Sequence, residues 1–282
     1  MMGRADCHIH SVLDGIHWKE AICRHEASPR EKLIREMLQK YRDLGYTYLR
    51  DGGDRWGVSV LARKLSPEYG ITYRTPGAPL YKKGHYGSFI GTGYENLQEY
   101  ANLVENARKT GLDFIKIMIS GLMDFNHFGV LTEPGMNPSQ IRQLIHIAHE
   151  EGMAVMAHAN GSETVIPAAE AGVDSVEHGA YLNGEALAAM KEAGTVWVPT
   201  LSTVGNLLGK DRFSQPDVEK ILESALQNVE TFGKMGGLMA PGTDAGAWAV
   251  PHGSDTELPL FRRAGVTPEM LRPGTAAIIE RF

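Results

Sequence analysis

Two histidines one residue apart near the start of the chain are the residues whose types and spacing best suit chemistry. His8 and His10 lie in Asp6-Cys7-His8-Ile9-His10, and side chains two positions apart in a strand point to the same face. Neutral imidazole nitrogen is a common ligand of zinc and related cations. The pair alone also fits two chance surface histidines, so a metal site requires further ligand-type residues at the ends of later strands.

Such residues recur along the chain. His158, His178 and Asp244 each end or follow a short apolar run, and Lys116 lies inside another. Taken singly, each has an ordinary structural explanation, such as a hydrogen-bonded core histidine, a helix cap for the aspartate or a snorkelling lysine. A lysine in an apolar strand does need a partner, because burial penalises its charged form. The joint occurrence of these groups at the ends of separate strands favours a metal site.

Short apolar strands alternate along the chain with amphipathic helices, a pattern that predicts a parallel sheet. We expect strands at 5–8, 46–50, 70–74, 114–119, 154–158, 175–178, 195–201 and 238–243, and helices at 29–44, 96–110, 138–151, 163–171, 184–193 and 215–235. Such an alternation in 282 residues predicts one α/β domain over residues 1–282, a (β/α)₈ or TIM barrel. The long irregular stretches 51–58, 76–94, 120–137 and 245–255 would then lie on the carboxyl-terminal face, beside the ligand-type residues.

Composition and charge exclude several classes of partner. The net charge is −6 and no basic run occurs, which argues against nucleic acid. Two cysteines make no disulfide framework, and no apolar signal segment or membrane-spanning run is present. We therefore expect a cytoplasmic protein whose partner is a small-molecule substrate rather than a membrane. A homo-oligomer is left open.

The ordered set of candidate ligands resembles the amidohydrolase superfamily, specifically its two-metal, prolidase-type branch, which is related to imidazolonepropionase and includes metal-dependent dipeptidases. The segments that carry the resemblance are Tyr48-Leu49-Arg50-Asp51-Gly52-Gly53, Phe114-Ile115-Lys116-Ile117-Met118, Ala157-His158-Ala159-Asn160-Gly161, Ser175-Val176-Glu177-His178-Gly179 and Gly242-Thr243-Asp244-Ala245-Gly246. The resemblance runs from residue 5 to about residue 270. Single-metal imidazolonepropionases and deaminases lack a lysine at the position of Lys116. The accessory N-terminal β-sandwich usual in the branch is expected to be absent here.

The resemblance also implies roles for the ligands. His8, His10 and Asp244 would bind one divalent ion, and His158 and His178 a second, with zinc the expected metal. Carbon dioxide would be incorporated as a carbamate on Lys116, and this group would bridge both ions. Asp244 would in addition be the catalytic acid–base, moving a proton from a metal-bridging hydroxide to the leaving amine.

Substrate contacts are expected from polar residues at or near the strand ends and in the loops of the same face. The candidates are Arg50, His85, Tyr86, Tyr181 and His252, and each also fits an ordinary loop or structural residue.

These inferences predict a metal-dependent hydrolase of an amide or peptide bond in a small substrate, such as an Xaa-Pro dipeptide or an N-acyl amino acid. A lactonase or phosphotriesterase-like hydrolase would use the same cluster and remains an alternative. A non-catalytic barrel acting as an assembly module is the alternative of another class, and it predicts eroded ligands.

Overall fold

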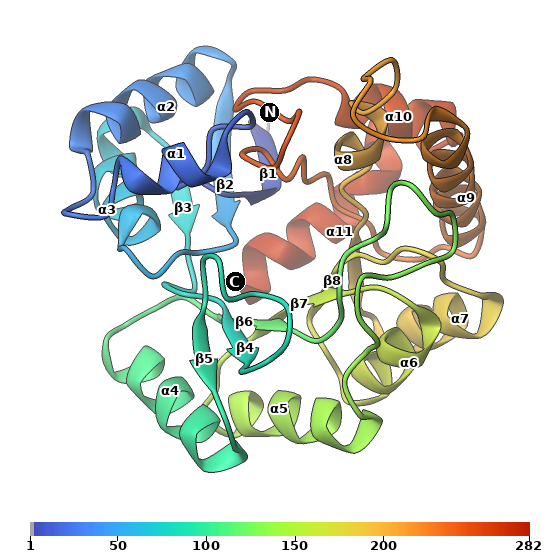
Figure 1. Ribbon diagram of the computed structural model, residues 1–282, viewed down its shortest axis with the longest axis horizontal. Helices are drawn as coiled ribbons and strands as arrows, with labels where there is room; N and C mark the ends of the chain where they lie inside the picture. Colours follow the sequence, from blue (N-terminus) through green and yellow to red (C-terminus); the bar gives the residue numbers. More distant parts are fainter. Residues whose placement is uncertain (1–2) are drawn as a thin grey trace.

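The computed structural model describes residues 3–282, and in it a ring of parallel strands is surrounded by helices (Figure 1). One parallel sheet contains β1 (Arg4–Ile9), β2 (Tyr46–Asp51) and β3 (Thr72–Arg74). A second contains β6 (Ile115–Met118), β7 (Val155–Ala159), β8 (Ser175–His178) and β9 (Val196–Val198). In its register Met118 pairs with His158, and Ala159 pairs with His178. The ends of neighbouring strands are therefore level with one another.

The two sheets are joined into a barrel by an irregular eighth segment, residues 238–245. Met239 bridges to Trp197 of β9, and Ala245 bridges to Ile9 of β1. The Asp244 amide donates to the His8 carbonyl at 2.7 Å. On the opposite side of the ring, the Asp113 amide donates to the Thr75 carbonyl at 3.1 Å. The predicted (β/α)₈ barrel is confirmed, and each of its eight expected strands lies in the ring.

Helices cover the outside of the ring. The longer ones are α2 (Glu31–Asp43), α3 (Val58–Leu65), α4 (Leu97–Lys109), α5 (Pro138–Glu150), α6 (Ser162–Glu170), α7 (Gly184–Ala193), α9 (Gln215–Lys234) and α11 (Pro268–Arg281). The short ones are α1 (Trp18–Cys23), the 3₁₀ helix η1 (Ser66–Tyr69), α8 (Ser202–Gly205) and α10 (Glu257–Arg263).

Helix α5 shows why these segments fold as they do. The Asn137 side chain caps its first turn, and Pro138 occupies the first helical position, where no backbone donor is needed. Ile141, Leu144 and Ile145 recur with helical spacing and are fully buried. All six helices expected from the sequence are present, and the further helices α1, α3, α8, α10 and α11 lie outside the expected ranges.

The loop after β3 contains structure that the sequence did not indicate. Within the stretch 76–94, expected to be irregular, lie β4 (Leu80–Lys82) and β5 (Thr92–Tyr94). Leu80 pairs with Ile117 of β6 and also with Thr92 of β5. Neither Leu80-Tyr81-Lys82 nor Thr92-Gly93-Tyr94 forms an apolar run that would indicate a strand. The expectation that the whole stretch is irregular was therefore wrong.

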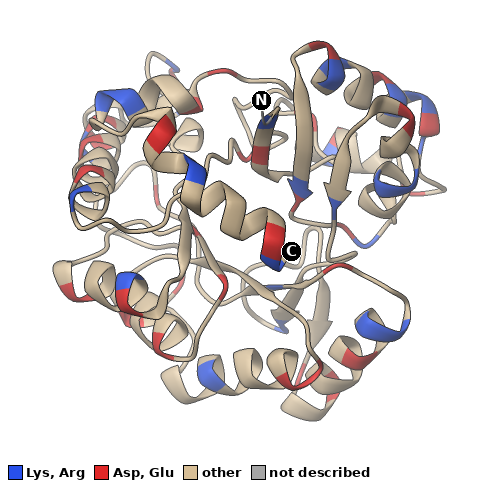
Figure 2. Cartoon of the chain, turned by 180° about the vertical axis from the view of Figure 1, so that it is seen from behind, with Lys and Arg blue, Asp and Glu red and all other residues tan. Residues whose placement is uncertain are grey.

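The outer helices carry basic and acidic residues close together (Figure 2). This interspersed surface agrees with the modest net charge of −6. Over residues 3–282, no helix combines the length and the apolar character that crossing a bilayer requires.

Candidate metal centre

The predicted metal ligands meet at the carboxyl-terminal end of the barrel. The Oδ1 atom of Asp244 lies 3.4 Å from His10 Nε2 and 3.6 Å from His8 Nε2. Ligand atoms of these three residues all lie within 4.8 Å of one another. The His178 ring centroid lies 4.6 Å from that of His158 and 5.2 Å from that of His8. The structure thus brings both expected ligand groups into one buried cluster.

An unusual backbone conformation at His178 helps to build the cluster. Adjacent residues of a strand normally face opposite sides, yet both Glu177 and His178 contact His8. His178 has φ 67°, and Asp244 has φ 57°. Left-handed backbone is rare and costly for residues other than glycine, and it concentrates at functional sites. The departure from strand geometry allows neighbouring side chains to reach the same interior space.

Lys116 occupies the middle of the cluster. Its Nζ atom lies 3.0 Å from His8 Nε2, and the residue is 1% exposed. Burial lowers the pKa of Lys116 to about 8, although the nearby Glu177 and Asp244 charges act in the opposite direction. A minor fraction of this amine is therefore neutral near neutral pH, far more than for an exposed lysine. Only a neutral amine can attack carbon dioxide, so the site suits the expected carbamate chemistry.

Three of the histidines have one ring nitrogen in a hydrogen bond to the protein, which leaves the second ring nitrogen available to a cation. His8 Nδ1 lies 2.7 Å from Glu177 Oε2, and His178 Nδ1 lies 2.8 Å from Thr200 Oγ1. His158 uses its other nitrogen, since Nε2 lies 3.2 Å from the Gly121 carbonyl. Such partners orient metal-binding imidazoles.

The protonation of these rings also suits a cation. Burial is the main cause that lowers the pKa of His8, His10 and His178 well below the usual value, and that of His158 to about 3. The rings are therefore neutral near neutral pH, which is the form that binds metals.

A buried oxygen provides an independent test of whether a cation fits. Asp244 Oδ1 is inaccessible to solvent and has no hydrogen-bond partner among residues 3–282. Buried polar atoms are normally satisfied, and a lone carboxylate oxygen between imidazole nitrogens lacks only a positive charge. Burial of the carboxylate also raises the pKa of Asp244 to about 7, because its charged form has lost contact with water. The residues present fit a divalent cation.

The structure brings one of the expected substrate residues directly against this cluster. The Tyr86 ring lies 4.9 Å from the His158 ring, and its backbone amide donates to Glu133 Oε1 at 2.7 Å. Its neighbour His85 is partly exposed, with Nδ1 3.7 Å from the same Glu133 oxygen. Tyr181 packs edge-on against Phe128 of the 120–137 loop, with ring centroids 5.6 Å apart.

Two other expected substrate residues, His252 and Arg50, form hydrogen bonds within the protein. His252 donates from Nε2 to the Leu13 carbonyl at 2.9 Å, and its Nδ1 lies 3.2 Å from the Tyr41 hydroxyl. Arg50 is fully buried inside the barrel rather than at its mouth. Its guanidinium donates to Glu177, to Ser175 and to the Cys7 carbonyl. The structure therefore places Arg50 where it positions other side chains, and not where a substrate at the open face would bind.

Sequence reasoning missed Glu177, although a signal for it exists. Ser175 and Glu177 lie on the same face of β8 and are both fully buried. A buried carboxylate requires a buried positive charge, and Arg50 in β2 provides it for Glu177. The pairing partner, 127 residues away, could not be chosen from the sequence alone.

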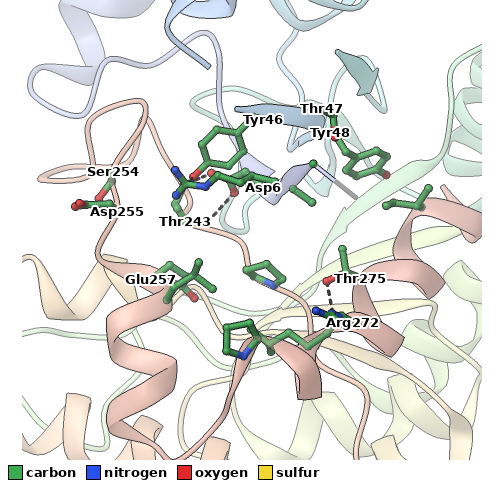
Figure 3. Close-up of a pocket in the computed structure, with 18 residues that line it drawn as sticks. Asp6, Tyr46, Thr47, Tyr48, Thr243, Ser254, Asp255, Glu257, Arg272 and Thr275 are labelled. Carbon is green, nitrogen blue, oxygen red and sulfur yellow. Dashed lines mark hydrogen bonds between the residues drawn. The ribbon is translucent and has the colours of Figure 1, made fainter. Parts of the chain in front are cut away.

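A separate cavity of about 580 Å³ lies at the opposite, amino-terminal ends of β1 and β2. Figure 3 shows Tyr46, Asp6 and Thr243 on one side of it and Arg272 and Thr275 of α11 on the other. The Asp6 carboxylate in this cavity already accepts hydrogen bonds from the Thr243 amide and hydroxyl. None of the candidate metal ligands lines this cavity.

The fold and this residue set define a barrel protein with a candidate divalent-metal site at its carboxyl-terminal face. The model of the Amidohydrolase family matches residues 53–281, and the chain belongs to that family, which implies a divalent metal centre. The expected resemblance is thereby confirmed.

Individual relatives agree with this assignment. Ochratoxinase of Aspergillus niger is 27% identical over 98% of this chain and 64% of its own length, so the chain spans about two thirds of that relative. Among solved structures, an Xaa-Pro dipeptidase with bound methionine matches 99% of this chain and 75% of its own, at 22% identity and a TM-score of 0.77. A putative prolidase from Bifidobacterium longum matches 100% of this chain and 70% of its own, at 24% identity and a TM-score of 0.74.

Proposed function

We propose that this chain hydrolyses an amide or peptide bond in a small substrate, such as an Xaa-Pro dipeptide or an N-acyl amino acid. The observation that carries the proposal is the convergence of His8, His10 and Asp244 on one point, with Asp244 Oδ1 buried and otherwise unpartnered. The names of the similar proteins, a dipeptidase and a prolidase among them, support the same class of substrate.

The proposed centre holds two divalent ions, most simply zinc. His8, His10 and Asp244 form one set of ligands, His158 and His178 the other, and Lys116, carboxylated by carbon dioxide, lies between the two. Divalent cations bound there would polarise the scissile carbonyl and lower the pKa of a water molecule.

The protein's own groups supply proton transfer and orientation. Asp244 lies against both His8 and His10, and its proposed role is to take a proton from the attacking water and pass it to the leaving amine. Tyr86, whose ring lies against His158, is proposed to line the substrate site beside the metal centre. His85 and Tyr181 are proposed to contact the substrate from the loops of the same face.

A substrate panel tests this proposal. The zinc-loaded protein is incubated with Xaa-Pro dipeptides, N-acyl amino acids, lactones and phosphotriesters, and product formation is measured. We expect release of free amine from at least one dipeptide or N-acyl amino acid. Turnover of lactones or phosphotriesters alone would replace the proposal by the lactonase or phosphotriesterase-like alternative. A metal-loaded protein without any turnover would favour the non-catalytic assembly module.

A further inference from the structure

A hydrogen-bonded group of two charged residues and one serine lies directly behind His8, inside the barrel. Its members are Glu177 and Ser175 of β8 and Arg50 of β2, and all three are fully buried. The Arg50 guanidinium also lies over the Phe282 ring, 4.4 Å from its centroid. Packing from all sides leaves these side chains little freedom to rearrange.

Donors and acceptors in this group can be assigned without ambiguity from its chemistry. Arginine can only donate, so the Ser175 hydroxyl accepts from Arg50 at 2.8 Å and its own proton points to Glu177 Oε1 at 2.6 Å. Arg50 donates a second hydrogen bond to the same Oε1 atom at 2.8 Å. The orientation of the Glu177 carboxylate is therefore fixed by two donors on one oxygen.

The other oxygen faces the metal ligand. Glu177 Oε2 lies 2.7 Å from His8 Nδ1, while His8 Nε2 faces Lys116 Nζ at 3.0 Å and Asp244 Oδ1 at 3.6 Å. A neutral imidazole carries its proton on one nitrogen and a lone pair on the other. An acceptor at Nδ1 draws the proton to that side.

We propose that Glu177, held by Arg50 and Ser175, is a positioning residue that fixes the His8 proton on Nδ1 and so keeps Nε2 free to bind a cation. The inference rests on the proposed metal centre. It concerns the state of the chain before any ion binds, and this allows it to be tested apart from the proposed function.

The first experiment needs no variant. The tautomer of His8 is read from ¹⁵N chemical shifts of metal-free, histidine-labelled protein at neutral pH, with the signal assigned by its loss in His8→Gln. We expect the Nδ1–H tautomer. The Nε2–H tautomer in the wild-type protein would overturn the inference, even if the protein proved to be an active hydrolase.

The second experiment uses Glu177→Gln, which has nearly the same shape. Its single amide oxygen should stay with the two donors, Arg50 and Ser175, so that the NH₂ group faces His8 Nδ1. The His8 proton should then move to Nε2, and zinc affinity, measured by competition with a chelator, should fall by about 10–100-fold.

Glu257→Gln is the matched control, because Glu257 is also buried and accepts hydrogen bonds from the Leu201 and Ser202 amides. This control should leave the His8 tautomer and the zinc affinity unchanged. Equal losses of zinc affinity in both variants, with His8 keeping its tautomer, would show general destabilisation and overturn the inference.

Discussion

Asp244 is the residue to which both a ligand role and a proton-transfer role are proposed. Its Oδ1 atom is buried between two imidazole nitrogens, and the left-handed backbone at φ 57° directs it there. Asp244→Asn should keep most of the bound metal, because an amide oxygen still coordinates weakly and the other ligands remain. Turnover should fall by about 10²–10⁴-fold, the usual range for a positioned acid–base group. Metal content and kcat measured on the same preparation check both parts.

Asp255→Asn is the control for this substitution, since Asp255 is exposed in the segment that follows Asp244. It should leave both quantities unchanged. Near-normal turnover in Asp244→Asn would instead make Asp244 only a structural ligand.

At the scale of single residues, the sequence could predict the candidate metal ligands but not the groups that orient them. His8-x-His10 was predictable because its spacing matches the period of a strand. His158 and Lys116 were recognisable from the apolar strands around them. The hydrogen bond between Glu177 and His8 spans 169 residues, and the left-handed backbone at His178 follows from tertiary packing. Neither leaves a local pattern that a sequence could show.

Among the elements, the loop after β3 is the proposed source of contacts with a substrate carboxylate. Lys82 donates to Gln140 and Lys83 to Glu95. His85 is the chain neighbour of Tyr86, whose ring lies against His158, so His85 is the proposed partner of the carboxylate. His85→Ala should raise KM for a free-carboxylate substrate much more than for its amide analogue, because a buried carboxylate needs a partner. Steady-state kinetics with both substrates check this.

The exposed Lys83 supplies the comparison, and Lys83→Ala should leave both KM values unchanged. An equal rise of KM for the two substrates in His85→Ala would place the carboxylate site elsewhere.

Helix α11 shows, at the scale of elements, a local sequence signal that the fold overrides. It contains Pro273 and Gly274 in its interior, a pair that normally marks the end of a helix. The helix continues because Gly274 packs directly on the backbone of Met239, where a Cβ atom would overlap. The strands, by contrast, were predictable because their apolar runs are bounded by glycine and polar residues.

Gly274→Ala should therefore lower the free energy of unfolding by about 1–3 kcal/mol, the usual cost of overpacking. Urea unfolding followed by circular dichroism measures it. Gly184 at the start of α7 has open space around it, so Gly184→Ala should be neutral or slightly stabilising. No loss of stability in Gly274→Ala would mean that α11 can move away from Met239.

For the whole molecule, the barrel turns a linear order of ligands into a single centre. β1, β6, β7, β8 and the eighth segment each contribute a candidate ligand, and their carboxyl ends meet on one face because parallel strands share a direction. That these residues meet on one face could be predicted from the order of the strands in the sequence. The closure of the ring by isolated bridges at Met239 and Ala245 could not, since those contacts join segments far apart in the chain.

The content of metal and the mass of Lys116 test the proposed centre most directly. Folded protein prepared with zinc and bicarbonate is examined by elemental analysis and by native mass spectrometry. We predict about two divalent ions per chain, because the ligands form two sets, together with one carbon dioxide added at Lys116. A single ion per chain with unmodified Lys116 would contradict the two-metal mechanism.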